Sequence, residues 1–507
     1  MSNGVQNAVG DFVTQPITYE HSGFAQDDWR VNPDLTLNLG LRYEYVTTPF
    51  GYFSNAKPDI NNFGPRVGLA WNPKTRFGGN FVLRGGYAVA YDQVFQNILL
   101  NVSRNYPRVV TNTLTQCTGC AAFTGFGNIP LTATTTQATP GAANVRAFFA
   151  RTPANLPANL AALLDYRFYA LNERAKSPRS QQWTVSLQYQ LGKDYVVKAE
   201  YIGTKGSDLV REIETNYGFS PPIGNSQRLD PTQGSIVVGQ GLARSIYHSG
   251  QFTLEKRFGS MNLFGINWGG TQFNANYTYS SFISESDDVL GGQTNRTIPS
   301  DPRDPHSDRG RSGFDQPHRF VLSSIWNSPE IFRGNGFLNR IFSGYEIGTV
   351  TTIASGIPFT IYNANNAAGI LSSQISTVFL SQHVGLNPNG TGNSFTTASA
   401  AGVPVDPNAR YIIYPANSGI FGSLGANTER TPSTNQTNLR IAKRFRTFGE
   451  TQSLGFSMDV TNLFNRRNFT VIPTNTLSAT TTAASFLNYG LTNVIGRQFL
   501  FGARYEF

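Results

Sequence analysis

The sequence contains few charged residues, few cysteines and no long apolar run. Only 14% of its 507 residues are charged, against roughly 25% in a typical soluble domain. No apolar stretch approaches the roughly 18 residues of a membrane-spanning helix, which excludes a helical membrane protein. Two cysteines are too few for a disulfide framework. The first residues also lack the basic and apolar segments of a signal peptide.

The residues that are abundant point to a different membrane class. Aromatic residues make up 13% of the chain and glycine occurs 50 times, which is unlike an intrinsically disordered protein. The net charge is +9, but the lysines and arginines are scattered singly, and we therefore expect no nucleic-acid partner. A polar, aromatic-rich and charge-poor chain fits a transmembrane β-barrel, whose strands present one face to lipid and the other to water.

Alternation of apolar and polar residues predicts the strands. From Leu35 to Tyr45 every odd position is Leu or Tyr, and every even position is polar or glycine. One such strand fits a soluble sandwich as well as a barrel, but the pattern recurs in about thirteen segments, with aromatic residues at many strand ends. The segments are 19–31, 35–45, 67–71, 81–91, 183–191, 195–201, 252–258, 273–279, 320–326, 345–353, 439–445, 454–464 and 499–507.

The connections between these segments alternate in length. Short turns are predicted at 32–34, 72–79, 192–194, 259–263 and 447–450, and long polar segments near 46–62, 94–176, 211–244, 283–316, 363–433 and 466–494. Outer-membrane barrels have tight periplasmic turns and long external loops, whereas a sandwich has no reason to place every long loop at one end. The barrel is therefore the favoured interpretation.

We predict an all-β fold: an antiparallel, up-and-down transmembrane β-barrel over residues 17–507, with residues 1–16 a flexible segment in an external loop. About thirteen strands are expected, as the C-terminal part of a larger barrel of about 22 strands. Counting back from a periplasmic C-terminus places residue 1 outside the cell, whereas both ends of an even-stranded barrel are periplasmic. We therefore expect an upstream signal peptide, plug and first strands.

Several short motifs carry a family resemblance from about residue 17 to the C-terminus. Each motif is short, but they follow one another in the family's order. They are Phe24-Ala-Gln-Asp-Asp-Trp-Arg-Val31, Leu35–Glu44, Asn62-Phe-Gly-Pro-Arg-Val-Gly68, Tyr201-Ile-Gly-Thr-Lys-Gly206, Leu254-Glu-Lys-Arg-Phe258, Asn274–Ser280, Asp308-Arg-Gly310, Phe314–Val321, Ser355-Gly-Ile-Pro-Phe359 and Asn462-Leu-Phe-Asn465. The chain resembles TonB-dependent outer-membrane receptors, and more narrowly the Oar-like group.

This resemblance implies a receptor of the cell outer membrane. Its external loops would capture a large substrate, which then passes a plug that this chain lacks. The implied partners are outer-membrane lipid and lipopolysaccharide, the barrel-assembly machinery, and TonB through the missing plug region. No cofactor is implied, and siderophore, oligosaccharide and peptide all stay open as substrates, as do import and export.

Two other functional classes remain. A surface adhesion or structural outer-membrane protein is favoured by the large Thr-, Asn- and Ala-rich loops. A barrel enzyme needs a carboxylate/His or Ser/His set at one rim, and the sequence offers no convincing set. We therefore expect no enzymatic activity and no catalytic residue.

The last strand ends the chain on an aromatic residue. Phe501, Tyr505 and Phe507 lie on one face of this strand by alternation. A terminal aromatic on such a strand resembles the signal that the barrel-assembly machinery reads. The alternative is an ordinary last strand that ends in Phe.

Cys117 and Cys120 lie in the longest predicted loop. Their spacing occurs in redox and zinc motifs, but there is no second pair and no histidine at ligand spacing. A local loop disulfide is the favoured interpretation, ahead of a metal site or catalysis.

Carboxylates crowd the segment 283–316. Asp301, Asp304 and Asp308 are candidate Ca²⁺ ligands because calcium prefers oxygen donors. The spacing matches no EF-hand, and the interleaved arginines favour a salt-bridged loop without metal.

Two further sets of polar residues have structural interpretations. His318, with Asp315 and Arg319, is interpreted as a hydrogen-bonded cluster at the barrel rim, not as a catalytic set. The inward-facing charges are expected to pair across strands or to contact a plug more often than to bind substrate. They are Arg42, Glu44, Arg66, Arg84, Lys198, Glu200, Asp459, Arg504 and Glu506.

Overall fold

The structure is a computed structural model. It describes residues 4–10, 17–47, 57–74, 80–93, 109–115, 167–171, 176–231, 235–263, 266–287, 298–329, 336–371, 382–446, 452–469, 475–478, 480–489 and 496–507. Within these residues, no helix has the length and apolar character needed to span a membrane.

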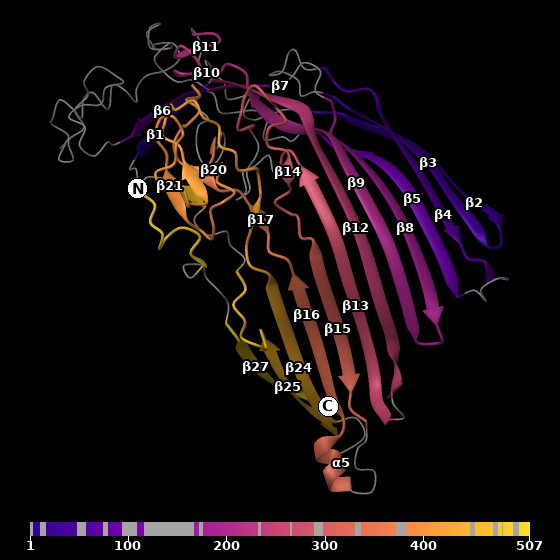
Figure 1. Cartoon of the computed structure of the whole chain (residues 1–507). Helices are drawn as coiled ribbons and strands as arrows, with labels where there is room; N and C mark the ends of the chain where they lie inside the picture. The colour runs from indigo at the N-terminus through magenta and orange to yellow at the C-terminus, as the bar shows by residue number, and fades with distance from the viewer. Residues whose placement is uncertain are drawn as a thin grey trace.

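One large antiparallel sheet dominates the molecule, and its strands follow one another in chain order (Figure 1). Its continuous path has thirteen strands, which confirms the predicted number and the predicted all-β, up-and-down topology. The path consists of β2 (Glu20–Asn32), β3 (Leu35–Val46), β4 (Asn62–Trp71), β5 (Phe81–Tyr91), β8 (Arg179–Leu191), β9 (Tyr195–Glu214), β12 (Ser235–Leu263), β13 (Ile266–Ser284), β15 (His318–Asn327), β16 (Tyr345–Ala354), β24 (Thr434–Arg446), β25 (Ser453–Thr461) and β27 (Gln498–Glu506).

The pairing register keeps apolar residues on one face of the sheet. Leu39 lies opposite Val67, Val67 opposite Tyr87, and Tyr87 opposite Trp183, so that these four side chains share a face. Leu39, Val67 and Tyr87 are exposed there. No other described part of the protein covers this apolar row, and contact with lipid explains why it can stay uncovered.

The next row belongs to the opposite face and is polar or small. Asn38 pairs with Gly68, Gly68 with Gly86, and Gly86 with Thr184. Because side chains alternate between faces along a strand, one sheet has an apolar side and a polar side. We call these the lipid face and the lumen face.

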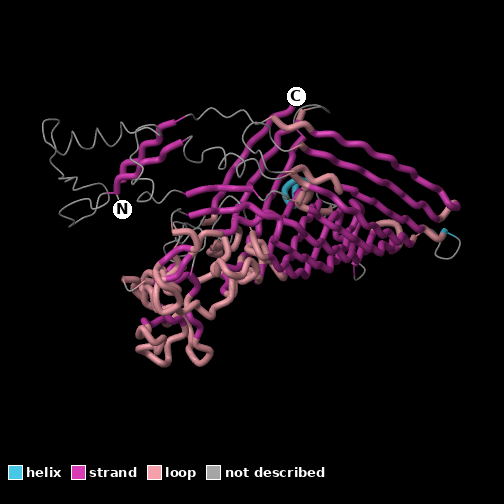
Figure 2. Tube along the Cα trace, turned by 90° about the horizontal axis from the view of Figure 1, so that it is seen from above, coloured by secondary structure: helices cyan, strands magenta, loops and turns pink. Residues whose placement is uncertain are grey.

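The two ends of the sheet differ (Figure 1). The short connections, the helix α5 (Gly336–Phe342) and the C-terminus lie at one end, and the long connections lie at the other. Figure 2 shows that the sheet is curved. The path begins at β2 and ends at β27, and no pairing joins these two strands in the described part of the chain.

Several predicted boundaries are wrong. The turn predicted at 259–263 is part of β12, and its glycine and serine accommodate two register shifts against β13 rather than a reversal of the chain. The long connection predicted at 211–244 is shorter in the structure and covers 215–234, since β9 continues to Glu214 and β12 begins at Ser235. The strand predicted to reach residue 464 ends at Thr461, and Asn462 has a φ of 54°, which turns the chain.

Other differences concern connections that the sequence did not predict. The connection between β15 and β16 contains α5 at the short-turn end, so the strict short/long alternation has an exception. Gly4–Gly10, in the segment predicted to be flexible, form β1 and pair antiparallel with β6 (Val109–Thr115). Two strands join the large sheet off its main path: β7 (Arg167–Leu171) pairs parallel with β12, and β14 (Gly310–Arg311) pairs antiparallel with β13.

The long connections carry small sheets of their own at the other end of the molecule (Figure 1). These sheets are β10 (Gly218–Phe219) with β11 (Gln227–Arg228); β17 (Pro358–Phe359) with β23 (Glu429–Arg430); β18 (Tyr362–Asn363) with β19 (Gln382–His383) and β26 (Thr476–Leu477); and β20 (Gly385–Leu386) with β21 (Phe395–Thr397) and β22 (Tyr411–Ile413). We call the described residues of the connections 215–234, 285–317, 355–433 and 462–497 the loop assembly.

Candidate functional site

The loop assembly has hydrophobic cores of its own. The larger core joins residues of the 355–433 connection, such as Phe359, Tyr411 and Ile413, to Leu477 and Phe486 of the last long connection. All three residues of β22 are buried, without alternation, because both of its sides are covered. The connections therefore fold against one another and are not separate solvated loops.

A second core brings in the remaining long connections. Phe219 from the 215–234 connection and Ile298 from the 285–317 connection pack with Ile370 of the 355–433 connection. At its edge the guanidinium of Arg303 lies 5.0 Å from the Phe219 ring and 4.8 Å from the Phe421 ring. Cation–π contacts of this kind add to the packing.

A buried charge network lies beside these cores. Arg211, at the outer end of β9, is 0% exposed and donates through Nη2 to Asp308 Oδ2 at 2.8 Å. Ser300 donates to the same carboxylate from its backbone nitrogen at 2.9 Å and its hydroxyl at 2.5 Å. His383 Nε2 lies 3.8 Å from Asp308 Oδ1, while its Nδ1 lies 2.8 Å from the Leu424 carbonyl. The network thus connects a barrel strand to two long connections.

The surroundings of Asp308 shift its ionisation. Burial raises the pKa of this carboxyl, but the charges of His383 and Arg211 and the hydrogen bonds from Ser300 outweigh burial and hold the pKa below its ordinary value. Asp308 is therefore ionised at neutral pH, as its pairing with Arg211 requires.

Further ion pairs lie within the loop assembly, next to the barrel rim. Glu285, just after β13, accepts hydrogen bonds from the Arg244 backbone nitrogen at 3.0 Å and from Arg309 at 3.4 Å, and lies 3.0 Å from His306 Nδ1. Asp315 pairs with Arg430 of the 355–433 connection. The carboxylates of Glu285 and Asp315 are buried and accept several hydrogen bonds, which favours one relative placement of the segments that contact them.

The cluster predicted around His318 is divided among different partners. His318 Nδ1 lies 2.8 Å from the Tyr277 hydroxyl, and its ring lies 5.1 Å from the Tyr279 ring. Asp315 instead accepts from the Phe282 backbone nitrogen and pairs with Arg430. His318 is therefore held by tyrosines of β13, while Asp315 is held by a backbone nitrogen and an arginine.

The three candidate Ca²⁺ ligands do not converge. Asp301 forms a bidentate pair with Arg303, Asp304 accepts from the His306 backbone nitrogen, and Asp308 is held in the buried network. Among the described residues no group of three His, Cys, Asp or Glu side chains has the geometry to hold a metal ion. Cys117 and Cys120, the predicted loop disulfide, lie outside the described residues.

The lumen-face charges pair partly along strands and partly across them. Arg42 pairs with Glu44, and Lys198 Nζ lies 2.7 Å from Glu200 Oε2, in each case along a single strand. Arg440 and Asp459 are direct cross-strand neighbours and lie 3.4 Å apart. The remaining contacts are Arg84 Nη1 to Gln188 Oε1 at 3.0 Å, Arg444 to Glu506 at 3.3 Å, and Arg504 to Glu506 at 3.1 Å.

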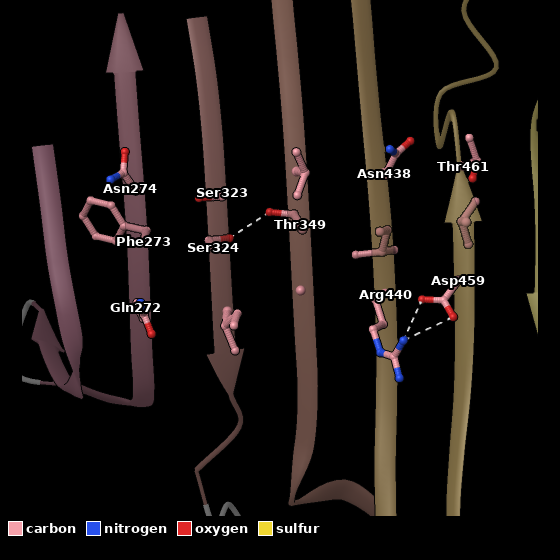
Figure 3. A pocket seen from close by; sticks show the side chains of 15 residues that line it. Gln272, Phe273, Asn274, Ser323, Ser324, Thr349, Asn438, Arg440, Asp459 and Thr461 are labelled. Carbon is pink, nitrogen blue, oxygen red and sulfur yellow. Dashed lines mark hydrogen bonds and ion pairs between the residues drawn. The ribbon is translucent and has the colours of Figure 1, made fainter. Parts of the chain in front are cut away.

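A groove of about 490 Å³ crosses the lumen face of β13, β15, β16, β24 and β25 (Figure 3). Its polar side chains include Asn274, Asn438 and the Arg440–Asp459 pair. Ile325 and Val350 are exposed in it, at 43% and 48%. The lining of the groove is therefore mainly apolar, with amide and charged groups beside the apolar part. The sequence alternation did not indicate it, because both aliphatic residues stand where polar ones were expected.

The C-terminal strand presents its aromatic residues as predicted by alternation. Phe501, Tyr505 and Phe507 share the lipid face, and Phe507 is 93% exposed. The rings of Tyr505 and Phe507 are 6.4 Å apart and stacked. Their role in assembly stays a prediction.

The arrangement described so far, with a lipid face, a lumen face and long connections at one end, is that of an outer-membrane barrel wall. The family model that matches the sequence is that of the outer membrane beta barrel domain, over residues 1–56 and 51–498. The chain belongs to this family. It is therefore a protein of the cell outer membrane, as its sequence predicted.

Solved structures agree with the family at the level of fold. The chain is similar to the outer membrane transporter YddB from Escherichia coli, with a TM-score of 0.51 and 12% identity over 97% of this chain and 45% of YddB. It is also similar to the siderophore receptor PirA from Acinetobacter baumannii, with a TM-score of 0.45 and 12% identity over 98% of this chain and 47% of PirA. The chain thus spans less than half the length of these proteins. No curated protein sequence matches it.

Proposed function

We propose that the chain is the barrel portion of a TonB-dependent outer-membrane receptor that captures a large substrate with its loop assembly and passes it along the lumen beside a plug domain. In this proposal the long connections are external, and the receptor acts by binding and transport without chemical turnover. Its partners are outer-membrane lipid and lipopolysaccharide, the barrel-assembly machinery and TonB.

One observation carries the proposal: four long connections pack into a single assembly at one end of the barrel wall. Its cores and its buried Arg211–Asp308 pair join residues more than ninety positions apart in the chain. A packed assembly presents a shaped surface, which binds a ligand with a smaller entropy loss than flexible loops do. Such a surface is suited to the capture of a large external substrate.

The lumen face supports the transport step. Its side chains are polar or small along the central rows, and the groove beside Arg440 and Asp459 offers both hydrogen-bonding and apolar contacts. A polar substrate or a plug can form hydrogen bonds with such a wall, and water can take over these bonds when the substrate or plug moves on.

A deletion strain tests the proposal. The strain is grown on ferric siderophores as the iron source, and on oligosaccharides or peptides as the carbon or nitrogen source. We expect growth on at least one of these to fail, to be restored by the intact gene, and to fail again when TonB is inactivated. Normal growth on all of them, together with lost attachment to surfaces or to other cells, would replace transport with adhesion as the function.

A further inference from the structure

The helix α5 lies at the short-turn end of the barrel wall (Figure 1), and it exposes apolar side chains. Phe337 is 73% exposed, Phe342 is 50% exposed and Ile341 is 39% exposed, while no residue of the helix is buried. A helix of seven residues is marginal by itself in water. Three exposed apolar residues on so short an element indicate a surface that meets something other than water.

The C-terminal end of α5 is attached to the lipid face of the sheet. Lys443 Nζ donates to the Ile341 carbonyl at 2.5 Å. The same ammonium lies 4.1 Å from the centre of the Tyr345 ring and 5.0 Å from that of Phe445. A cation beside the last carbonyls of a helix is favourable because these groups carry partial negative charge.

The register shows on which side of the wall this contact lies. Tyr345 pairs with Lys443, and Lys443 pairs with Phe456, so the three side chains share a face. It is the lipid face, since Phe456 in turn pairs with Ala503 of the aromatic-bearing side of β27. Lys443 is nevertheless only 9% exposed, because α5 and the two rings cover it. The helix therefore lies against the lipid side of the wall, not below the lumen.

We propose that α5 is an interfacial membrane anchor: it lies in the headgroup region of the leaflet at the short-turn end and inserts Phe337, Ile341 and Phe342 among the acyl chains. In outer-membrane barrels this leaflet is the periplasmic one, made of phospholipid. The surface is continuous with the lipid face through Tyr345 and Phe445. Arg340, in the last turn, is exposed and supplies the basic side chain that interfacial helices direct toward lipid phosphates.

Depth-dependent fluorescence quenching tests the anchor in the full chain. Cys117 and Cys120 are replaced by Ser, Phe337→Cys is labelled with an environment-sensitive fluorophore, and the protein is reconstituted in phosphatidylethanolamine/phosphatidylglycerol vesicles. The matched control is Lys193→Cys, which lies in the exposed turn between β8 and β9 at the same end of the wall. Phe342→Cys provides a second site if the first label disturbs folding.

We expect lipids with a quencher near the headgroup to reduce emission at positions 337 and 342 by about twofold, with a blue shift, and to leave position 193 unchanged. Water-like, unquenched emission at both helix positions in folded protein would overturn the proposal. Equal quenching at position 193 would also overturn it, because the signal would then report a general closeness to the vesicle. Loss of quenching on adding a periplasmic protein extract would assign the surface to a protein partner instead.

Discussion

Replacing Asp308 by Asn should loosen the loop assembly while leaving the barrel wall folded. The substitution keeps the shape of the side chain but removes the charge that faces Arg211 at 2.8 Å. Both side chains are almost fully buried, at 2% and 0% exposure, so water cannot replace the lost interaction. Removing one partner of a buried pair typically costs about 3–5 kcal/mol.

Hydrogen exchange of the full chain measures this cost where it arises. An assembly that opens as a unit exchanges its amides at a rate set by its own opening free energy. A loss of about 3 kcal/mol corresponds to exchange more than about a hundredfold faster. We expect this acceleration in β18, β19 and β22, and unchanged protection in the central strands β12 and β13.

Two control variants distinguish the effect of losing the buried pair from the effect of removing a charge anywhere in the loop assembly. Asp301→Asn breaks the pair with Arg303, whose side chain is 45% exposed, and should cost less than about 1 kcal/mol. Combining Arg211→Met with Asp308→Leu should cost less than Asp308→Asn alone, because an apolar pair leaves no buried charge. Exchange in Asp308→Asn within about threefold of the wild type would refute the argument that this network holds the connections together.

Three further predictions concern pH, the lipid face and assembly. The folded-state pKa of Asp308 lies below its ordinary value of 3.8, so the stabilisation by this carboxylate is present above about pH 4 and is lost as the pH falls through the folded pKa. Acidification should therefore speed hydrogen exchange in the loop assembly of the wild type. The exchange of Asp308→Asn should depend less on pH. Leu39→Arg should lower the free energy of unfolding, measured by a folding titration into vesicles, by about 2–4 kcal/mol if residue 39 is near the bilayer midplane. Asn38→Ser on the lumen face should lower it by less than about 1 kcal/mol. Equal losses in the two variants would contradict the assignment of faces. Phe507→Ser should lower the yield of protein in the outer membrane although it removes little contact area, and a normal yield would leave Phe507 an ordinary last residue.

The barrel wall could be predicted from the sequence because lipid imposes a strict rule on each strand. Between Leu35 and Tyr45 the alternation indicates that the segment is a strand and which side chains face lipid. Each of the thirteen predicted segments overlaps a strand of the sheet. The rule fails where lipid is absent. β9 and β12 continue past the alternating region, and their outer ends, including Arg211, were therefore assigned to a loop.

The loop assembly could not be predicted in the same way, because its contacts join distant segments. Asp301, Asp304 and Asp308 look alike in the sequence, yet only Asp308 is buried, and its partner Arg211 lies 97 positions away. One signal was present: the run Tyr411–Tyr414 is entirely apolar or aromatic within a polar connection, which is typical of a strand covered on both sides.

Labelling of intact cells tests whether this sheet spans the outer membrane with its long connections outside. With Cys117 and Cys120 replaced by Ser, a membrane-impermeant thiol reagent is applied to Asn393→Cys, in the loop assembly, and to Lys193→Cys, in a short turn. Position 393 should be labelled in intact cells, and position 193 only after the outer membrane is permeabilised. Labelling of position 193 in intact cells, with position 393 protected, would show that the short turns, and not the long connections, face the outside.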